Sequence, residues 1–123
     1  MSRTVEFADV QRRITEFGER ATLITVTADH RPHVVTGLIQ PIGDHLATRV
    51  GSRTAANLAE RPAITLTWSP LPGGDYILIL DGTAELNGDP GSDGVTEITI
   101  SVERGILHRV AELPASGPTC IAL

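Results

Sequence analysis

Short segments rich in β-branched residues, separated by tight turns, make up most of this chain. Six of them can be delimited, at residues 21–28, 33–42, 45–50, 63–69, 75–86 and 95–102. The turns after the first two are so short that the first three strands are predicted to form an antiparallel meander. Gly82 lies inside the longest segment and predicts a bend or bulge there. The sequence therefore predicts a mainly β fold, a small six-stranded antiparallel barrel with a few short helices.

The two ends of the chain depart from this β pattern. Val10, Ile14 and Phe17 form a one-sided apolar stripe, which predicts an amphipathic N-terminal helix within residues 1–20. Residues 111–123 contain two prolines and a glycine, and we expect an extended tail that reaches a partner subunit. No linker, repeat or low-complexity stretch divides the sequence, so residues 1–123 are predicted to form a single domain.

A second helix is predicted to begin at Gly51–Ser52, with Ser52 as its N-cap, and to end before Pro62, because a residue before proline avoids the α conformation. The start of a helix presents unpaired N–H groups and the positive end of the helix dipole, which suits a phosphate group. Arg49 and Arg53 flank this point, and the polar residues close to them are Thr48, Ser52, Thr54 and Asn57. Two interpretations are open: a phosphate-binding site, or a capped surface helix that carries two solvated arginines.

Composition removes several classes of function. All ten basic residues are arginines, so a Schiff-base lysine, a pyridoxal-phosphate lysine and a Walker-type phosphate loop are excluded. A formal net charge of −5 without a basic run argues against nucleic acid and anionic membranes as partners. His30 and His33 form a close histidine pair, but no third ligand has a suitable spacing, so no metal site is predicted.

Size and cysteine content bear on assembly and location. A chain of 123 residues is small for an enzyme that must enclose a substrate alone, so we expect a homodimer. Its single cysteine, Cys120, cannot form an intrachain disulfide, and the N-terminus lacks the apolar core of a secretory signal. No window approaches the length of a membrane span. We therefore expect a cytoplasmic protein.

Three segments resemble the pyridoxamine 5'-phosphate oxidase-like family of FMN-binding split β-barrels. They are R-P-H-V-V at residues 31–35, A-T-R-V-G-S-R-T-A-A-N-L-A-E-R-P-A-I-T-L-T-W at residues 47–68, and D-G-T-A-E-L at residues 81–86. The most specific part is G-S-R followed by A-x-N-L, a proline and an apolar strand, while S-V-E-R-G-I-L-H-R at residues 101–109 is weaker support. The similarity covers approximately residues 20 to 110 of the chain.

This resemblance implies a homodimer of split barrels with cofactor sites at the interface. The flavin phosphate would lie on the turn that matches Gly51, Ser52, Arg53 and Thr54. The strand that matches residues 33–38 would lie along the flavin ring, so its candidate contacts are Val35, Thr36 and Gly37, with Gly37 allowing close backbone approach. Trp68 is a further candidate for the ring pocket, although an aromatic residue on an alternating strand can equally be a core or dimer contact.

Three departures from the family pattern refine the functional prediction. The family often has a lysine where this chain has Thr54, so Arg49 would have to supply the missing charge and FMN binding is expected to be weaker. Residues 87–94 replace a longer insertion, and His108–Arg109 stands where true pyridoxamine phosphate oxidases have Trp-Arg. Oxidation of vitamin B6 is therefore not expected.

The predicted function is that of an oxidoreductase that transfers a hydride to or from a small organic substrate. Its cofactor would be FMN or, alternatively, the deazaflavin coenzyme factor 420, which carries the hydride itself and requires no catalytic triad. No catalytic residue can be singled out. Two alternatives stay open: a protein that binds a flavin or haem without turnover, and a dimer that has lost its cofactor.

Overall fold

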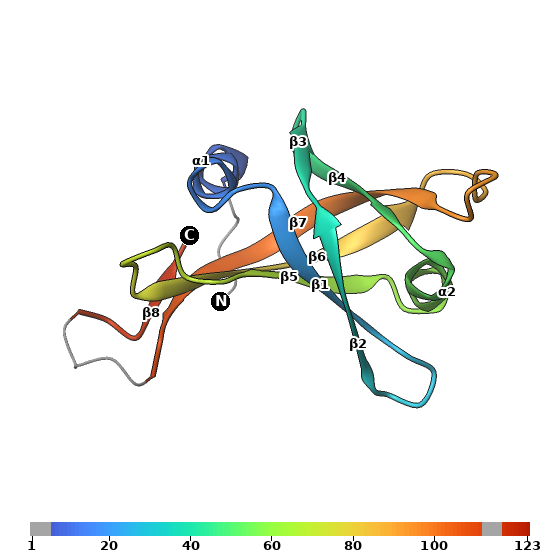
Figure 1. Ribbon diagram of the computed structural model, residues 1–123. Coiled ribbons are helices and arrows are strands. Elements are labelled where there is room, and N and C mark those ends of the chain that lie inside the picture. The colour runs from blue at the N-terminus through green and yellow to red at the C-terminus, as the bar shows by residue number, and fades with distance from the viewer. Residues whose placement is uncertain (1–5, 112–116) are drawn as a thin grey trace.

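The computed structural model describes residues 6–111 and 117–123, which contain two helices and eight strands (Figure 1). In chain order they are α1 (Phe7–Phe17), β1 (Arg20–Val26), β2 (Pro32–Leu38), β3 (Gln40–Ile42), β4 (His45–Val50), α2 (Ser52–Glu60), β5 (Ala63–Trp68), β6 (Tyr76–Leu86), β7 (Thr96–Arg109) and β8 (Cys120–Ala122). The mainly β class and the two short helices are confirmed. None of the helices in these residues is long and apolar enough to cross a membrane.

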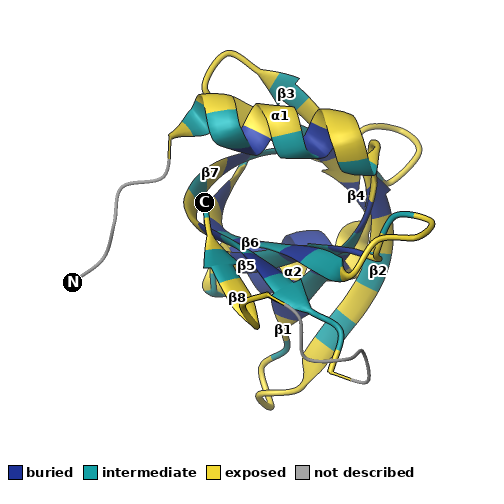
Figure 2. Ribbon diagram, turned by 90° about the vertical axis from the view of Figure 1, so that its left-hand side faces the viewer, coloured by how far each residue is buried: buried dark blue, intermediate teal, exposed yellow. Residues whose placement is uncertain are grey.

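A single antiparallel sheet contains all the strands, in the order β2-β1-β5-β6-β7-β4-β3, with β8 added beside β7. The two ends of this order, β2 and β3, are neighbours in the chain and are separated only by Ile39. The sheet therefore curls back on itself into a split barrel (Figure 2). The helices α1 and α2 lie towards opposite ends of the curled sheet (Figure 1).

The predicted six strands become eight for two reasons. The segment predicted at residues 33–42 is broken at Ile39, which is 1% exposed and whose N–H donates to the carbonyl of Glu19 at 2.7 Å. As a result β2 pairs with β1, whereas β3 pairs with β4, so the simple three-strand meander was wrong. The other addition is β8, which lies in the C-terminal tail and pairs with β7.

The bend predicted at Gly82 is confirmed. The register between β6 and β7 shifts between Asp81 and Gly82, and a Cβ on Gly82 would lie 2.3 Å from the carbonyl oxygen of Ser101. Beyond this bulge β7 continues to Arg109, seven residues past the predicted end of the last strand at residue 102, because β6 offers it a partner along its whole length.

Alternating strand residues and one face of each helix form the core (Figure 2). From α1 the buried side chains are Val10 and Ile14, as the apolar stripe predicts, while Phe17 is only partly buried. From α2 they include Ala55 and Leu58. Gly18 adopts a φ of 98° and ends α1, where its carbonyl accepts a hydrogen bond from Nε1 of Trp68 at 2.9 Å. These contacts fix both helices to the barrel. They place the start of α2 beside β2 and β4.

Candidate functional site

The site begins where β4 passes into α2. Gly51 is the N-cap residue, with φ −76° and ψ 177°, and no side chain caps the helix. The prediction of Ser52 as N-cap was wrong by one position, since Ser52 already has helical geometry and is the first residue of α2. Because Gly51 has no side chain, the N–H groups of the first turn have no side-chain cap, which leaves them available to an anion.

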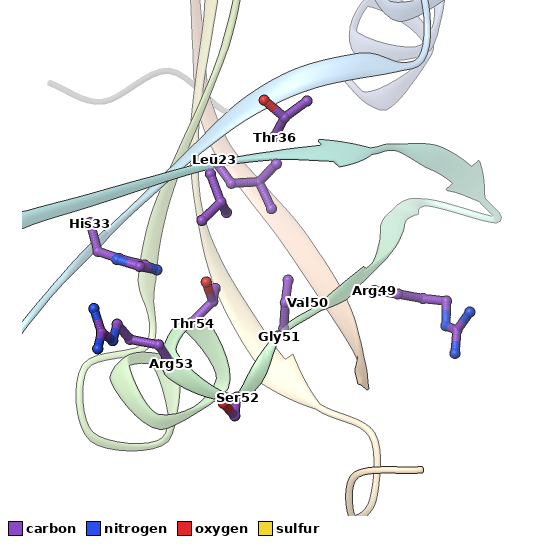
Figure 3. A pocket seen from close by; sticks show the side chains of 10 residues that line it. Leu23, His33, Thr36, Arg49, Val50, Gly51, Ser52, Arg53 and Thr54 are labelled. Atoms are coloured by element: carbon purple, nitrogen blue, oxygen red, sulfur yellow. The ribbon is translucent and has the colours of Figure 1, made fainter. Parts of the chain in front are cut away.

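A pocket of about 300 Å³ lies against this helix start (Figure 3). Its lining comes from β1, β2, β4 and the first turn of α2, and consists of Leu23, His33, Val35, Thr36, Arg49, Val50, Gly51, Ser52, Arg53 and Thr54. The titratable side chains in this lining are two arginines and a histidine, and no carboxylate is among the described residues that form it. We call this hollow the phosphate pocket.

The two arginines of the phosphate pocket differ in their surroundings. Figure 3 shows the guanidinium of Arg53 on the same side of the pocket as the His33 ring, whereas Arg49 points to the opposite side. Nη2 of Arg49 lies 2.9 Å from Oδ2 of Asp93, in the loop between β6 and β7. The side chains of Arg53 and His33 make no hydrogen bond or ion pair within the described part of the chain. The expected compensation of the missing lysine by Arg49 is therefore opposed by a bound carboxylate.

Asp93 is held firmly in its charged form. The backbone N–H of Val95 donates to its Oδ1 at 3.0 Å, and this bond, with a further contribution from Arg49, lowers the pKa of the carboxyl below its usual value although desolvation acts in the opposite direction. At neutral pH Asp93 is therefore a fixed negative charge beside Arg49.

A larger pocket of about 860 Å³ adjoins the first and shares Thr36 and Arg49 with it. It runs along β2, β3, β4 and the first half of β7, and its lining is Arg20, Thr36, Gly37, Leu38, Gln40, Ile42, His45, Leu46, Ala47, Thr48, Arg49, Asn87, Val95, Glu97, Ile98 and Thr99. We call it the ring pocket. Together the two hollows form a continuous site with a basic end and a more apolar end.

Two features of the ring pocket bear on whether a flavin-type cofactor fits. Thr48 is 6% exposed, and its buried Oγ1 has no hydrogen-bond partner within the described residues, which suits a ligand that supplies one. A Cβ on Gly37 would lie 2.8 Å from Cδ1 of Leu23 and 3.2 Å from Oγ1 of Thr48. A side chain at this position would press on β1 and β4, so glycine leaves the backbone of β2 close to both strands at the border of the pocket. With the donors of the phosphate pocket, these residues fit a ligand that combines a flat ring with a phosphate.

Most of the residues predicted for the site are brought together. Val35, Thr36, Arg49, Gly51, Ser52, Arg53 and Thr54 line the phosphate pocket, and Thr36, Gly37, Thr48 and Arg49 line the ring pocket. Thr54 is only 2% exposed, so the position of the family's lysine is occupied here by a buried side chain.

Two predicted residues lie in neither pocket. Asn57 is 6% exposed and donates from Nδ2 to Oγ1 of Thr25 at 3.1 Å, which ties α2 to β1. Trp68 is 3% exposed and belongs to the core. An inward-facing position on β5 places its indole inside the barrel, so of its alternative roles the structure shows the core one.

Sequence reasoning missed His33 and Asp93. His33 precedes Val35 by two residues on the same strand, and side chains of a strand alternate between faces, so the prediction of Val35 implied the same face for His33. Nothing in the sequence signalled Asp93, because its contact with Arg49 joins residues 44 positions apart.

Comparisons with known proteins agree with this architecture. No protein-family model matches the chain. The uncharacterized protein Mb0449c of Mycobacterium bovis is 31% identical over 115 residues, which cover 82% of this chain and 80% of that protein.

Three solved structures share the fold at lower sequence identity. A putative pyridoxamine 5'-phosphate oxidase from Listeria innocua superposes with a TM-score of 0.65 at 20% identity, covering 83% of this chain and 98% of its own. An F420 reductase gives a TM-score of 0.63 at 16% identity, covering 76% and 94%. The haem storage protein HutZ from Vibrio cholerae gives 0.61 at 12% identity, covering 80% and 92%. The chain thus belongs to one family with the mycobacterial protein Mb0449c, and it shares its split β-barrel fold with these three solved structures.

Proposed function

We propose that the protein binds a phosphorylated flavin-type cofactor and uses it to transfer a hydride to or from a small organic substrate. The observation that carries this proposal is the continuous site in which a helix start without a side-chain cap adjoins a pocket of about 860 Å³, beside Arg53, whose side chain pairs with none of the described residues. The names of the similar structures, which include an F420 reductase and a putative pyridoxamine 5'-phosphate oxidase, support a cofactor of this class.

In this proposal the first turn of α2 and Arg53 hold the phosphate, and the backbone of β2 from Val35 to Gly37 supports the ring. When bound, the cofactor supplies the hydride chemistry, so the chain contributes binding, orientation and exclusion of water. Oγ1 of Thr48, buried at the ring pocket without a partner in the described residues, supplies a hydrogen bond that helps to orient the ring.

FMN is the proposed cofactor and the deazaflavin coenzyme factor 420 is the alternative. The terminal phosphate of FMN carries nearly two negative charges and fits a compact basic pocket, whereas the phosphodiester of factor 420 carries one. Because Asp93 pairs with Arg49, the positive charge is concentrated at Arg53 and the helix start, which favours a small terminal group over a long acidic tail.

Titration of the purified protein with each cofactor, followed by fluorescence quenching, tests the proposal. We expect binding of FMN in the micromolar range or tighter, and weaker binding of riboflavin, which lacks the phosphate. Tighter binding of factor 420 than of FMN would make factor 420 the cofactor in place of FMN. Failure of both to bind would reject the oxidoreductase function.

We propose further that the active form is a homodimer. Three large apolar side chains on β2 and β3 are well exposed: Val34 (58%), Leu38 (51%) and Ile42 (59%). Leu38 and Ile42 also border the ring pocket, so a second copy on this surface would close that pocket. An obligate dimer typically buries more than about 2,000 Å². Sedimentation should show a dimer at micromolar concentration, and Ile42→Asp should shift it towards monomer. Leu71→Asp, a matched change at an apolar residue of the loop between β5 and β6 that lines neither pocket, should not.

A second candidate function is storage or capture of a cofactor without turnover. It is favoured by His45, whose imidazole lines the ring pocket and would hold a haem iron there, and by the shared fold of a haem storage protein. An absorbance spectrum after addition of haemin separates the two functions, because a Soret shift that is lost in His45→Ala supports haem binding. An unchanged Soret band leaves the flavin-dependent function as the proposal.

A further inference from the structure

Building on the proposed function, we propose that His33 in its protonated form is the second cation of the phosphate pocket, in place of Arg49. Anion binding by this chain then strengthens as the pH falls through the neutral range. The inference concerns a residue that determines how strongly, and at which pH, the pocket holds a phosphate.

The position of His33 supports this role. It lies on β2, half-buried, and lines the phosphate pocket together with Ser52 and Arg53 of α2. Figure 3 shows its ring turned towards the pocket on the side where the Arg53 guanidinium lies. A small anion at the start of α2 would therefore have the imidazole and the guanidinium on the same side.

The charges around His33 leave it without a competing acid. From α2 the facing charge is Arg53, and across β1 the paired residue is the uncharged Thr25. In the turn just before β2, the side chain of Arg31 is 81% exposed, and its Nε lies 3.5 Å from Oδ2 of Asp29. No carboxylate lines the pocket within the described residues, so a bound anion would offset two positive charges there.

Arg49 cannot fill the same role without a cost. Its guanidinium is engaged by Asp93 at 2.9 Å and points away from Arg53 (Figure 3). To contact an anion beside Arg53 it would have to leave a carboxylate that Val95 keeps in place. His33 requires no such exchange, because its side chain makes no hydrogen bond or ion pair with the described residues.

The direction of the pH effect follows from linkage. Imidazole gains its charge in the physiological pH range, whereas guanidinium stays charged throughout. A bound anion favours the charged imidazole over the neutral one, so binding takes up a proton. Affinity therefore rises as the pH falls.

Sulfate is the probe that isolates this effect, since its charge is constant over the range used. We would titrate it into wild-type protein, His33→Gln and His30→Asn, and follow the backbone amide NMR signals of residues 51–54. His30→Asn is the matched control, because His30 lies in the turn before β2, lines neither pocket and has a φ of 64° that asparagine tolerates. The amide spectra also verify that each variant is folded.

The expected result is sulfate binding about tenfold tighter at about pH 6 than at about pH 8 in wild type and His30→Asn, as one charge-assisted hydrogen bond provides. His33→Gln should bind equally at both pH values and match wild type at the higher one. The same pH dependence in His33→Gln, a flat profile in wild type, or no response of residues 51–54 to sulfate would each overturn the proposal.

A parallel titration with FMN and riboflavin separates this inference from the proposed function. FMN should show the His33-dependent gain at the lower pH and riboflavin should not, because only FMN carries the phosphate. The expected sulfate pattern without any FMN binding would reject the cofactor while supporting the role of His33. FMN binding without a His33-dependent sulfate pattern would support the cofactor and reject the role of His33.

Discussion

Two arginines on the barrel, Arg104 and Arg53, illustrate the difference between a charge used for structure and a charge available to a ligand. Arg104 donates from Nε and Nη2 to Oδ2 of Asp81 at 3.1 and 2.8 Å, and the other oxygen of Asp81 accepts from Oγ1 of Thr65 at 2.6 Å. Arg53 has no such partner in the described chain and faces a pocket. Both are arginines of an acidic protein, so their roles follow from their neighbours.

The comparison is tested most directly by removing each arginine. Arg53→Ala should weaken FMN binding about ten- to a hundredfold, since a hydrogen bond to a charged group contributes roughly 1.5–3 kcal/mol. Arg104→Ala, the matched control at an arginine that is paired with Asp81, should leave FMN affinity unchanged. Fluorescence quenching measures both, and equal affinities in the two variants would show Arg53 to be a solvated helix residue.

A substitution at Gly82, next to the paired Asp81, should lower the stability of the fold and leave FMN binding unchanged. Gly82→Ala places a Cβ 2.3 Å from a backbone oxygen of β7, and overpacking of this kind typically costs about 1–3 kcal/mol. Urea unfolding should therefore show a lower midpoint, with FMN affinity unchanged below the transition. Ser101→Ala alters the side chain of the same neighbour without touching its carbonyl and should stay near wild type.

A substitution at Trp68 tests whether this aromatic residue serves the core or the cofactor site. Trp68→Phe keeps most of the buried area and removes the bond from Nε1 to the Gly18 carbonyl, so the free energy of unfolding should fall by about 1–2 kcal/mol. Affinity for FMN should not change. A selective loss of FMN binding, with thermal stability retained, would show that Trp68 contributes to the cofactor site.

Asp93 offers the smallest effect and the sharpest test of why Arg49 differs from Arg53. Asp93→Asn should free Arg49 and tighten FMN binding by about threefold at low salt, the scale of an exposed ion pair. Raising the ionic strength should reduce this gain. A weaker affinity in the variant would mean that the loop carboxylate supports the site instead of competing with the ligand.

The pH dependence of Asp93 is opposite to that proposed for His33. Its pKa is lowered in the folded protein, chiefly by the Val95 N–H, so its contribution to stability is present above the ordinary carboxyl pKa and is lost as the pH falls through the lowered value. Between about pH 6 and pH 8 the carboxylate stays charged. Any pH effect on sulfate binding in that range therefore cannot come from Asp93, and Asp93→Asn should retain it.

Much of the fold could be inferred from local pattern. The alternation in residues 63–69, the bulge at Gly82 and the helix after Gly51 depend on neighbours within a few positions, where side-chain period and backbone conformation act directly. The break at Ile39 could not be inferred, because it is set by Glu19 and by two different partner strands, β1 and β4.

The site divides along the same line. The phosphate pocket could be anticipated in Gly51, Ser52 and Arg53, since a helix start and its flanking arginine lie within one turn of chain. Its remaining properties required the tertiary structure, because they arise from contacts between distant segments. The pairing of Arg49 with Asp93, the burial of Trp68 and the approach of His33 to Arg53 all depend on segments far apart in the chain, whose mutual position is set by how the whole sheet curls.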